Sequence, residues 1–360
     1  MTRIALNGFG RIGRQVFKVL WQKYPRLEVC AIGVTDPSRT PTRAILLKYD
    51  SVYGQFAPAV EPCVEGKKNC LVVDGREIPL VARMERYGPT RWASYGADIV
   101  IDATGYCRTR QLAERHLHQG AQKAIVTMPM EGEDITIIMG VNQHDYDPQQ
   151  HHIISSSTAS TMCLAPVAKV LQDEVGVIEG MMTTVHSYTN GQSLLDKARE
   201  DPRASRAAHL NIVPTRTTAV EEASHIVPAL KDRFLGSALA VPVPVVSLLD
   251  LTAHLAEPMS IDQVNQAFRE ASLGGMQGIL GYTEDELVSS DFIGDSHSAV
   301  MDAKSTMTAG PLVKVQAWYD NEWGYANRVA DLAALIADEL EPAPSGEWRV
   351  AKVPARAAGQ

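Results

Sequence analysis

Short apolar runs alternate with longer amphipathic stretches over residues 3–105. The runs at residues 3–7, 27–34 and 98–105 read as buried strands, and a helical pattern covers about residues 12–23. This alternation of strand and helix signals predicts βαβ units. The apolar side chains expected on the sheet-facing side of the helix are Ile12, Val16, Val19 and Leu20.

Three further apolar runs, at residues 124–129, 135–140 and 151–157, extend this pattern. They predict a doubly wound, largely parallel Rossmann sheet of about six strands. The first part of the chain is therefore expected to have an α/β fold, with a domain over residues 1–158.

The apolar runs then become longer, at residues 177–189, 237–256 and 310–320. Such runs are expected in a second domain of the α+β class with a mixed or antiparallel sheet, placed at residues 159–324. A helical pattern at residues 325–341 follows, and we expect this helix to return to the first domain and complete it.

Composition narrows the class of protein. The chain has 360 residues, 45% of them apolar, and a net charge of −8, which gives no electrostatic footprint for nucleic acid. No apolar run approaches the roughly 20 residues needed to span a bilayer. The first strand begins at about residue 3, which leaves no room for a targeting peptide, so a cytoplasmic location is expected. Residues 342–360, with Trp348 as their one large anchor, predict a flexible tail.

Cysteine usage points to neither a disulfide framework nor a metal site, and no metal is expected. The cysteines are odd in number and irregularly spaced, so most should be reduced packing residues. They are Cys30, Cys63, Cys70, Cys107 and Cys163.

A GxGxxG motif at Gly8, Gly10 and Gly13 follows the first strand and opens the first helix. In this context the first glycine permits a tight turn, the second lets the backbone approach a pyrophosphate, and the third allows close packing. The free N–H groups at the helix N-terminus favour phosphate. The motif therefore predicts a nicotinamide dinucleotide site.

The residue that would select the cofactor is ambiguous. The second strand ends without the usual acidic residue, and Asp36 would reach the adenosine ribose only if its loop bends back. Otherwise Ser38, Arg39 and Thr40 are candidates to hold a 2′-phosphate. Loss of the strand-end carboxylate favours NADP slightly, and both NAD and NADP stay open.

Several longer segments are specific to one family. Together they resemble phosphorylating glyceraldehyde-3-phosphate dehydrogenase, and the match is collinear from about residue 3 to residue 340. The segments are NGFGRIGR (7–14), LLKYDSVYG (46–54), EDITIIMGVN (133–142), CLAP (163–166), TTVHSYT (183–189) and WYDNEWGY (318–325).

The resemblance implies an activity and an assembly. Members oxidise an aldehyde with NAD(P) and inorganic phosphate to an acyl phosphate, and they form homotetramers. A cysteine thiolate adds to the aldehyde so that the adduct can give up hydride, and a histidine, matched here by His186, acts as base. Cofactor contacts are expected from Gly8, Phe9, Gly10, Arg11, Ile12, Gly13, Asp36, Arg39, Thr104, Gly105, Thr127, Asn321 and Tyr325.

The chain departs from the family at the nucleophile. The family pattern SNASCTTNCLAP aligns with SSSTASTMCLAP at residues 155–166, and Ala159 takes the position of the catalytic cysteine. A methyl group forms no adduct, so the chain as written is expected to lack the dehydrogenase reaction. Ser160 and Thr158 flank this position, and neither hydroxyl is expected to have a base of its own. Cys163 is expected to be buried packing.

Two explanations of Ala159 stay open. It is either a substitution introduced to trap a complex, which the intact His186 and nicotinamide motif favour, or the mark of a natural relative. Such a relative would be a non-redox or catalytically silent protein that binds dinucleotide in a regulatory or biosynthetic role. Because Ser157 or Thr158 would cap the following helix, the surroundings still suit a thiolate.

Substrate recognition departs from the family as well. Ala240 replaces the arginine that holds the substrate phosphate, and Gly191 replaces a polar side chain, whereas Thr189 keeps its family identity. Arg216 is a new cation that would either enter an anion site or lie on the surface. The aldehyde is therefore uncertain. Candidate substrate and phosphate contacts are Thr158, Ser160, Thr189, Arg216, Thr217 and Thr218.

Overall fold

The computed structural model describes residues 1–65, 68–83 and 91–340, which fall into two compact units. Among the described residues, the first unit holds residues 1–136, 146–156 and 329–340, and the second holds residues 137–145 and 157–328. The unit boundary at 156/157 lies beside the expected one at 158. Residues 137–145, expected in the first domain, belong instead to the second unit.

Packing explains why residues 137–145 belong to the second unit. Ile137 and Ile138 are fully buried, and the Asn142 side chain caps the turn by accepting a hydrogen bond from the Ile138 amide at 2.8 Å. Gly140 lies so close to Ile279 that a Cβ at this position would be 2.7 Å from the isoleucine side chain. The run expected as a strand at residues 135–140 is therefore a strand only over Ile135–Thr136.

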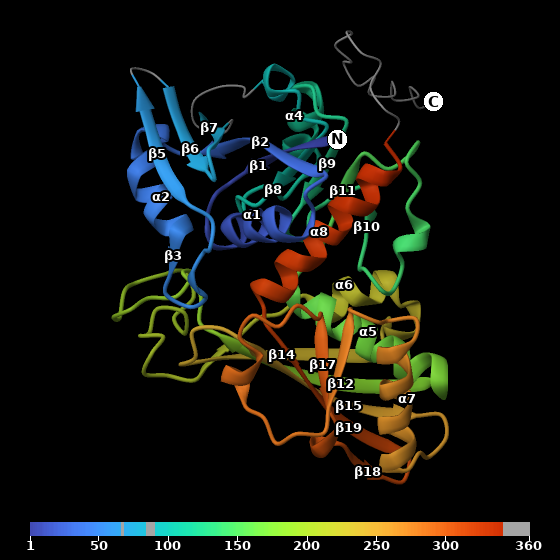
Figure 1. The fold of residues 1–360 in the computed structure, drawn as a ribbon. Helices are drawn as coiled ribbons and strands as arrows, with labels where there is room; N and C mark the ends of the chain where they lie inside the picture. Colours follow the sequence, from blue (N-terminus) through green and yellow to red (C-terminus); the bar gives the residue numbers. More distant parts are fainter. Residues whose placement is uncertain (66–67, 84–90, 341–360) are drawn as a thin grey trace, which may run out of the picture. The chain divides into compact units, whose positions relative to one another are not determined.

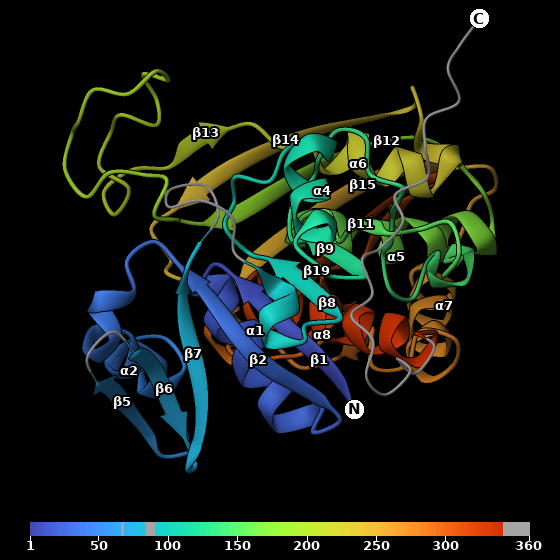
Figure 2. The ribbon, with the colours of Figure 1, turned by 90° about the horizontal axis from the view of Figure 1, so that it is seen from above.

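The first unit is built on a nine-stranded sheet with the order β10-β11-β9-β8-β1-β2-β7-β6-β5 (Figures 1 and 2). The pairs from β10 to β7 are parallel. Its strands are β1 (Thr2–Asn7), β2 (Leu27–Val34), β5 (Val60–Glu65), β6 (Lys68–Val73), β7 (Arg76–Ala82), β8 (Ile99–Asp102), β9 (Lys123–Val126), β10 (Ile135–Thr136) and β11 (Ile153–Ser155), with β3 (Tyr49–Asp50) and β4 (Gly54–Gln55) forming a separate pair. Its helical segments are α1 (Arg11–Lys23), η1 (Pro37–Arg39), α2 (Thr40–Lys48), η2 (Trp92–Tyr95) and α4 (Arg110–His118).

The central strands and α1 form as the hydrophobic pattern predicts. β2, β8 and β9 are apolar along almost their whole length because parallel strands are covered on both faces. In α1, Val16, Val19 and Leu20 are buried as expected, Phe17 joins them, and Ile12 is only partly buried.

The sheet is wider than the six strands predicted. The extra width comes from β5, β6 and β7, where β5 pairs with β6 and β6 with β7 in antiparallel register. Charged residues occur in each of these strands, among them Glu61, Lys68 and Arg76. The sequence pattern alone does not predict strands in this segment.

The second unit contains an eight-stranded mixed sheet in the order β13-β14-β12-β15-β19-β17-β16, with β18 paired to β19 (Figure 1). Its strands are β12 (Val177–Ser187), β13 (Val213–Thr215), β14 (Phe234–Val241), β15 (Ser247–Leu255), β16 (Leu280–Thr283), β17 (Ala299–Asp302), β18 (Met307–Ala309) and β19 (Leu312–Tyr319). Its helical segments are η3 (Gln143–Asp145), α5 (Ala159–Glu174), α6 (Ala219–Ile226), η4 (Pro228–Leu230), α7 (Ile261–Leu273), η5 (Ser289–Phe292) and η6 (Ala303–Ser305). The predicted mixed sheet is confirmed.

Buried and partly exposed residues alternate along two strands of this second sheet. In β15 and β19 every second residue is buried, which is the pattern of strands with one face on a core. β12 lies between β14, to which it is parallel, and β15, to which it is antiparallel. This register sets His186 opposite Ala240.

The last helix, α8 (Trp323–Asp338), begins in the second unit and continues in the first from Val329. Within the first unit, the Tyr24 hydroxyl donates to Asp331 and the Arg26 guanidinium pairs with Asp338, so the end of this helix is attached near the end of α1. The expected helix at residues 325–341 is thus present, slightly shifted. The tail expected at residues 342–360, with Trp348, lies outside the described residues.

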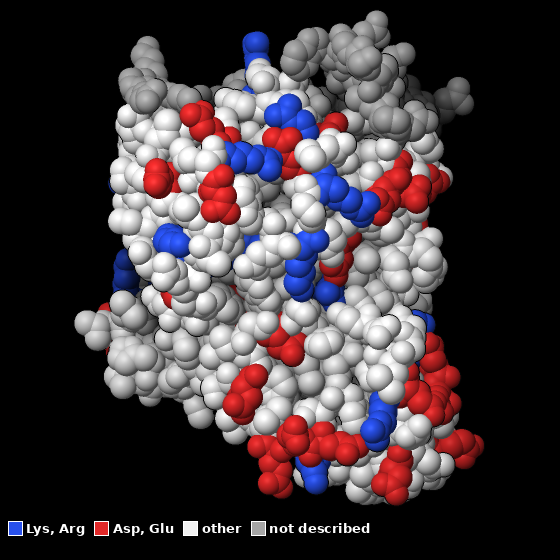
Figure 3. Space-filling model, viewed as in Figure 1, with Lys and Arg blue, Asp and Glu red and all other residues white. Residues whose placement is uncertain are grey.

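Charge is mixed on the surface. On the face shown in Figure 3, Lys and Arg side chains are interspersed with Asp and Glu side chains, with no continuous basic surface in view. Within residues 1–65, 68–83 and 91–340, no helix combines the length and apolarity needed to cross a bilayer.

Candidate functional site

A cleft in the first unit lies where β1, β2 and β8 end. It has a volume of about 240 Å³. In parallel α/β sheets, ligands bind at the carboxyl ends of the strands, so this is the expected place for a dinucleotide. Its lining residues are Gly8, Phe9, Gly10, Gly33, Val34, Thr35, Arg43, Arg83, Ala103 and Thr104.

The three motif glycines have different structural requirements. Gly8 has φ +105°, and a Cβ there would lie 2.7 Å from the Ala103 carbonyl carbon. A Cβ at Gly13 would lie 2.1 Å from the carbonyl oxygen of Gly8, so only glycine fits there. A Cβ at Gly10 would meet nothing within 4 Å. Gly10 is therefore free of packing constraints and leaves open space where a phosphate would approach.

The side chains next to the motif support the turn. Phe9 packs edge-on against Phe17, and Arg14 donates to the Phe9 carbonyl at 3.1 Å. Arg11 donates to the Asp50 carboxylate at 2.8 Å. Burial alone would raise the pKa of Asp50, but hydrogen bonds from the Val52 amide and the Arg11 guanidinium outweigh it and lower that pKa to about 2. The Arg11 side chain is thus held by an internal ion pair.

Asp36 and Arg39, the two alternatives for cofactor selection, form an ion pair with each other. The Asp36 carboxylate accepts hydrogen bonds from the Ser38 amide at 3.0 Å and its hydroxyl at 2.6 Å, and it pairs with Arg39 at 3.3 Å. The Arg39 side chain is 75% exposed. Thr40 donates to the Pro37 carbonyl at 2.7 Å. None of these side chains lines the cleft.

The cleft contains two other arginines, which the sequence reading missed. Arg43, on α2, donates to the Asp36 carbonyl at 2.7 Å, and burial lowers the pKa of its guanidinium. Arg83 lies over the Tyr106 ring, 5.4 Å from its centroid. Arg43 is four residues beyond Arg39, one helical turn further along α2, and only the path of the loop before α2 reveals which of them lines the cleft.

A buried network holds the far wall of the cleft. Asp102, at the end of β8, accepts from the Thr104 hydroxyl at 2.6 Å and from Asn7 at 2.8 Å, and His116 lies 3.0 Å from it. Burial would raise the pKa of Asp102, and these partners lower it. Thr127 donates to the Asp102 carbonyl at 3.0 Å. The predicted cofactor residues Thr104 and Thr127 are thereby positioned by one carboxylate residue.

Gly105 and Ile12 complete the predicted cofactor residues of this unit. Gly105 has φ +76°, a conformation that glycine adopts freely just after the β8 strand. Ile12, in the first turn of α1, is partly exposed. Neither lines the cleft.

In the second unit, the start of α5 is tightly held. Thr158 is its N-cap, and its Oγ1 accepts a hydrogen bond from the Thr161 amide at 3.1 Å. Ser157 has φ +54°, an uncommon conformation for a residue other than glycine. The Tyr325 hydroxyl donates to the Ser157 carbonyl at 2.9 Å, and the Ser157 hydroxyl donates to Glu222 at 3.2 Å. Ala159 therefore occupies the first position of a capped and anchored helix, where a thiolate would be stabilised.

Ser160 contradicts the expectation that its hydroxyl has no base. Its Oγ lies 3.0 Å from His186 Nε2 and 3.0 Å from the Tyr319 hydroxyl. Ser160 is the second residue of α5, and tertiary packing brings it close to the end of β12, where His186 lies. Tyr319 was missed as well, although it lies within the WYDNEWGY segment; nothing local in the sequence indicates its partner.

His186 is suited to accept a proton. Burial lowers the pKa of its imidazole below the usual value, so the neutral base prevails at neutral pH. Its neighbour across the sheet is Ala240, which is buried and opposes Val213 on β13. Ala240, where the resemblance implies a phosphate-binding arginine, is thus opposite His186 in the strand register and carries only a methyl group.

Asn321 and Tyr325, expected at the cofactor, have roles inside the second unit. The Asn321 oxygen accepts from the Ser187 hydroxyl and from the Val246 amide, both at 3.1 Å. Val246 has φ +70°, which is strained for a β-branched residue. Both bonds use the oxygen of Asn321, so they fix the orientation of its side-chain amide. Tyr325 is buried, with its hydroxyl on Ser157.

The remaining candidate phosphate residues do not gather in one place. Thr189 accepts a hydrogen bond from the Gly191 amide at 3.2 Å in an exposed loop. Arg216 is exposed beside a hollow that Glu200, Asp201 and Arg203 also line. Thr217 accepts from the Ala219 amide at 3.2 Å, and Thr218 is the N-cap of α6.

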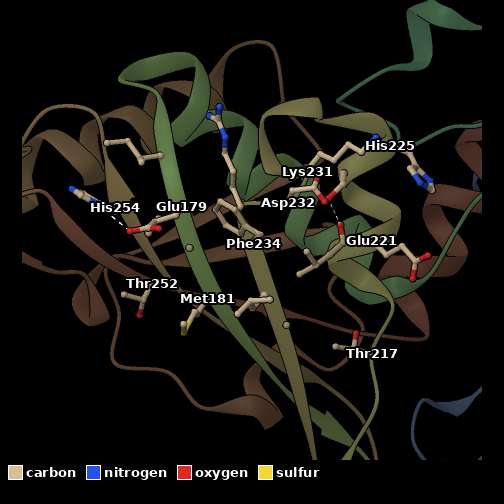
Figure 4. Close-up of a pocket in the computed structure, with 18 of the residues that line it drawn as sticks. Glu179, Met181, Thr217, Glu221, His225, Lys231, Asp232, Phe234, Thr252 and His254 are labelled. Carbon is tan, nitrogen blue, oxygen red and sulfur yellow. Dashed lines mark hydrogen bonds and ion pairs between the residues drawn. The ribbon is translucent and has the colours of Figure 1, made fainter.

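A separate hollow of about 1040 Å³ opens on the strands of the second unit (Figure 4). Strand side chains such as Met181, Phe234 and Thr252 line it, and Thr217 and Glu221 approach from α6 and the segment before it. Glu179 and His254 form an ion pair at 3.5 Å on its rim. We name this surface the strand hollow; His186 and Ser160 do not line it.

The cysteines are as predicted, all free. Cys163, one turn beyond Ala159 on α5, is fully buried, and burial raises the pKa of its thiol. A thiol in this state is a poor nucleophile, so Cys163 does not replace the missing one.

Comparison with known proteins places both units in one family. Residues 2–110 match the family described as glyceraldehyde 3-phosphate dehydrogenase, NAD binding domain, and residues 158–321 match glyceraldehyde 3-phosphate dehydrogenase, C-terminal domain.

Individual relatives match over almost their whole length. The chain is 47% identical over 339 residues to a glyceraldehyde-3-phosphate dehydrogenase of Geobacillus stearothermophilus, covering 94% of this chain and 99% of the relative. It is 47% identical over 337 residues to glyceraldehyde-3-phosphate dehydrogenase 1 of Bacillus subtilis, covering 93% and 98%. It is 43% identical over 340 residues to a glyceraldehyde-3-phosphate dehydrogenase of Streptomyces coelicolor, covering 94% of this chain and 99% of the relative.

Proposed function

This chain belongs to the glyceraldehyde 3-phosphate dehydrogenase family, and on that premise we propose that it is built for NAD(P)-dependent, phosphorylating oxidation of an aldehyde. In that reaction a nucleophile adds to the aldehyde, hydride passes to the nicotinamide, and phosphate releases the acyl group as an acyl phosphate. We further propose that the chain as written is inactive in this reaction, because Ala159 offers no nucleophile.

The observation that carries the proposal is the preserved machinery around Ala159. Thr158 caps α5, Tyr325 anchors the turn before it, and His186 has its Nε2 at the start of the same helix. The NAD-binding domain also keeps the glycine geometry of its motif. Restoring a thiol at position 159 tests the proposal directly.

The substrate is proposed to differ from the usual three-carbon phosphate. Ala240 lies beside His186 in the sheet register, so the charge-assisted fork that an arginine would offer a phosphate is lost. An aldehyde whose phosphate is placed further away, such as a longer phosphorylated sugar or a biosynthetic intermediate, fits this change.

A second function is favoured by the Ser160–His186 contact of 3.0 Å. A natural, non-redox relative would use His186 as an acid or base and would bind dinucleotide only in a regulatory or biosynthetic role. This alternative predicts turnover by the chain itself without reduction of nicotinamide.

For the cofactor, we propose that the chain is competent to bind NADP through Arg43. Arg39 and Asp36 pair with each other, so neither attracts nor repels a 2′-phosphate strongly, whereas Arg43 lines the cleft and keeps further N–H donors.

Arg43→Ala is expected to weaken NADP binding by about 10- to 100-fold, the range for loss of one charge-assisted contact, and to leave NAD binding nearly unchanged. Titration of each dinucleotide by calorimetry measures both effects. Arg39→Ala is the matched control and should change neither affinity. Equal weakening of both dinucleotides by Arg43→Ala would exclude a role in selecting the 2′-phosphate.

We propose a homo-oligomer, a tetramer as in the family, in which a second copy covers the strand hollow. Met181 is 64% and Leu235 66% exposed there, and the rim carries groups of both signs, including Glu221 and Lys231. A surface that pairs with its own copy must be self-complementary, and apolar residues with a rim of both signs meet this condition. The loop between β12 and β13 adds exposed apolar residues, which are Leu194, Leu195, Leu210 and Ile212.

Leu235→Asp is expected to convert the oligomer into smaller species, because it buries a charge in each copy of the interface. Sedimentation velocity would show the change in mass from multiples of the 39.2 kDa chain. Leu273→Asp is the control, since Leu273 is 71% exposed at the end of α7, outside the strand hollow. If both variants keep the mass of the parent protein, the strand hollow is not the interface.

A cytoplasmic location is also a proposal. The free cysteines support it, because structural disulfides are typical of oxidising compartments.

A further inference from the structure

We propose that Ser160 and His186 form a nucleophile–base pair that hydrolyses small activated acyl compounds, such as acyl phosphates and aryl esters. This activity needs no dinucleotide and no thiol at position 159. It therefore stands apart from the proposed oxidation and does not depend on it.

The geometry of the pair suits proton transfer from Ser160 to His186. The separation of 3.0 Å between Ser160 Oγ and His186 Nε2 is within the range in which a general base takes a proton from its nucleophile. The neutral imidazole that prevails at neutral pH accepts at this nitrogen when its proton is on Nδ1. Ser160 then donates its only proton to the base, as an attacking hydroxyl requires.

The Tyr319 hydroxyl is the second hydrogen-bond partner of Ser160. Because Ser160 donates to His186, the Tyr319 hydroxyl at 3.0 Å is the donor to Ser160 Oγ. Burial raises the pKa of Tyr319, so its hydroxyl keeps its proton. When Tyr319 donates to Ser160 and Ser160 donates to His186, each of the three side chains has a hydrogen-bond partner. The Ser160 hydroxyl is then held in its orientation toward His186.

Exposure and charge around Ser160 also bear on the reaction. Ala159 ends at Cβ where the family has a longer side chain, and both Ala159 and His186 are partly exposed. Ser160 itself is buried, at 8% exposure, so a small acyl group has to reach its Oγ past these two partly exposed residues. The Thr161 amide in the first turn of α5 is bonded to the Thr158 cap, so the charge for an oxyanion comes from the rest of the helix N-terminus, which favours negative charge.

The reaction balances without an oxidant. Ser160 Oγ bonds to the acyl carbon while its proton passes to His186, and the bond from that carbon to the alcohol or phosphate oxygen breaks, with the proton returned to the leaving group or to solvent. Water then attacks the acyl-serine, His186 takes its proton, and Ser160 regains one as the carboxylic acid leaves.

The test uses the full chain and p-nitrophenyl acetate, with no dinucleotide added. Release of p-nitrophenolate is followed by absorbance, and peptide mass spectrometry locates the acetyl group after quenching. We expect an acetyl group on Ser160 of the unaltered chain, and a fall in hydrolysis of about 100-fold or more in Ser160→Ala and His186→Gln. Tyr319→Phe should give a smaller loss.

Controls separate this result from side reactions and from misfolding. Ser272→Ala should hydrolyse the ester at the parent rate, because the Ser272 hydroxyl donates only to the Arg269 carbonyl at the end of α7. Thermal unfolding of each variant reports whether it is folded. The adduct on the unaltered chain is independent of any variant. No acetyl group on Ser160, an acetyl group confined to cysteine or lysine, or an unchanged rate in a folded Ser160→Ala would each overturn the proposal.

Discussion

Ala159→Cys is expected to raise aldehyde-dependent NAD(P)H production by about 10⁴-fold or more, because loss of a covalent nucleophile costs up to about 10⁶-fold in enzymes that depend on one. Position 159 is the first residue of α5 behind the Thr158 cap, so a thiol there gains the field of the helix N-terminus. His186 supplies the base. Absorbance at 340 nm with aldehyde and phosphate measures the gain.

The pH profile of this variant adds an independent readout. Burial lowers the pKa of His186, so the neutral base persists as the pH falls to 6.5 and is lost only below it. Activity should therefore hold from neutral pH down to about 6.5 and decline under more acidic conditions.

Two controls define what the gain means. Ala159→Ser should stay near the parent rate, since a hydroxyl is a much weaker nucleophile at neutral pH than a thiolate. Ala159→Cys combined with His186→Asn should lose most of the recovered activity. If Ala159→Cys shows no gain with any of a panel of phosphorylated and neutral aldehydes, the chain is not a dehydrogenase lacking only its thiol, and the non-redox alternative takes its place.

Gly13→Ala is expected to lower the free energy of unfolding by about 3 kcal/mol and to abolish dinucleotide binding, because the added methyl group strikes the Gly8 carbonyl oxygen and forces α1 away from the turn. Gly10→Ala meets no such contact. It should cost less than about 1 kcal/mol of stability, yet weaken dinucleotide binding by obstructing the pyrophosphate.

Urea unfolding and a dinucleotide titration on both variants separate the two effects. The pair acts as its own control, since each variant adds one methyl group to the same motif. Should Gly10→Ala bind dinucleotide as tightly as the parent chain, the pyrophosphate does not approach this turn, and the assignment of the cleft would be wrong.

Much of the dinucleotide site could be predicted because it is local in sequence. The strand, the GxGxxG turn and α1 occupy adjacent residues, and the glycine spacing alone states which backbone positions must come close. The selection of the cofactor could not be predicted in the same way. Asp36, Arg39 and Arg43 are near neighbours along the chain, and only the path of the backbone through η1 and α2 decides that two of them pair and the third lines the cleft.

The candidate catalytic site in the second unit likewise has a part that the sequence predicts and a part that it does not. Short motifs identify Ala159 and His186 and place a helix cap at Ser157 or Thr158, and the long apolar runs predict the mixed sheet. The partners of Ser160 do not, since His186 is 26 and Tyr319 159 residues away along the chain. Strand register and helix packing bring these groups together. Such contacts depend on which faces the strands and helix bury against each other, and no local pattern records that choice.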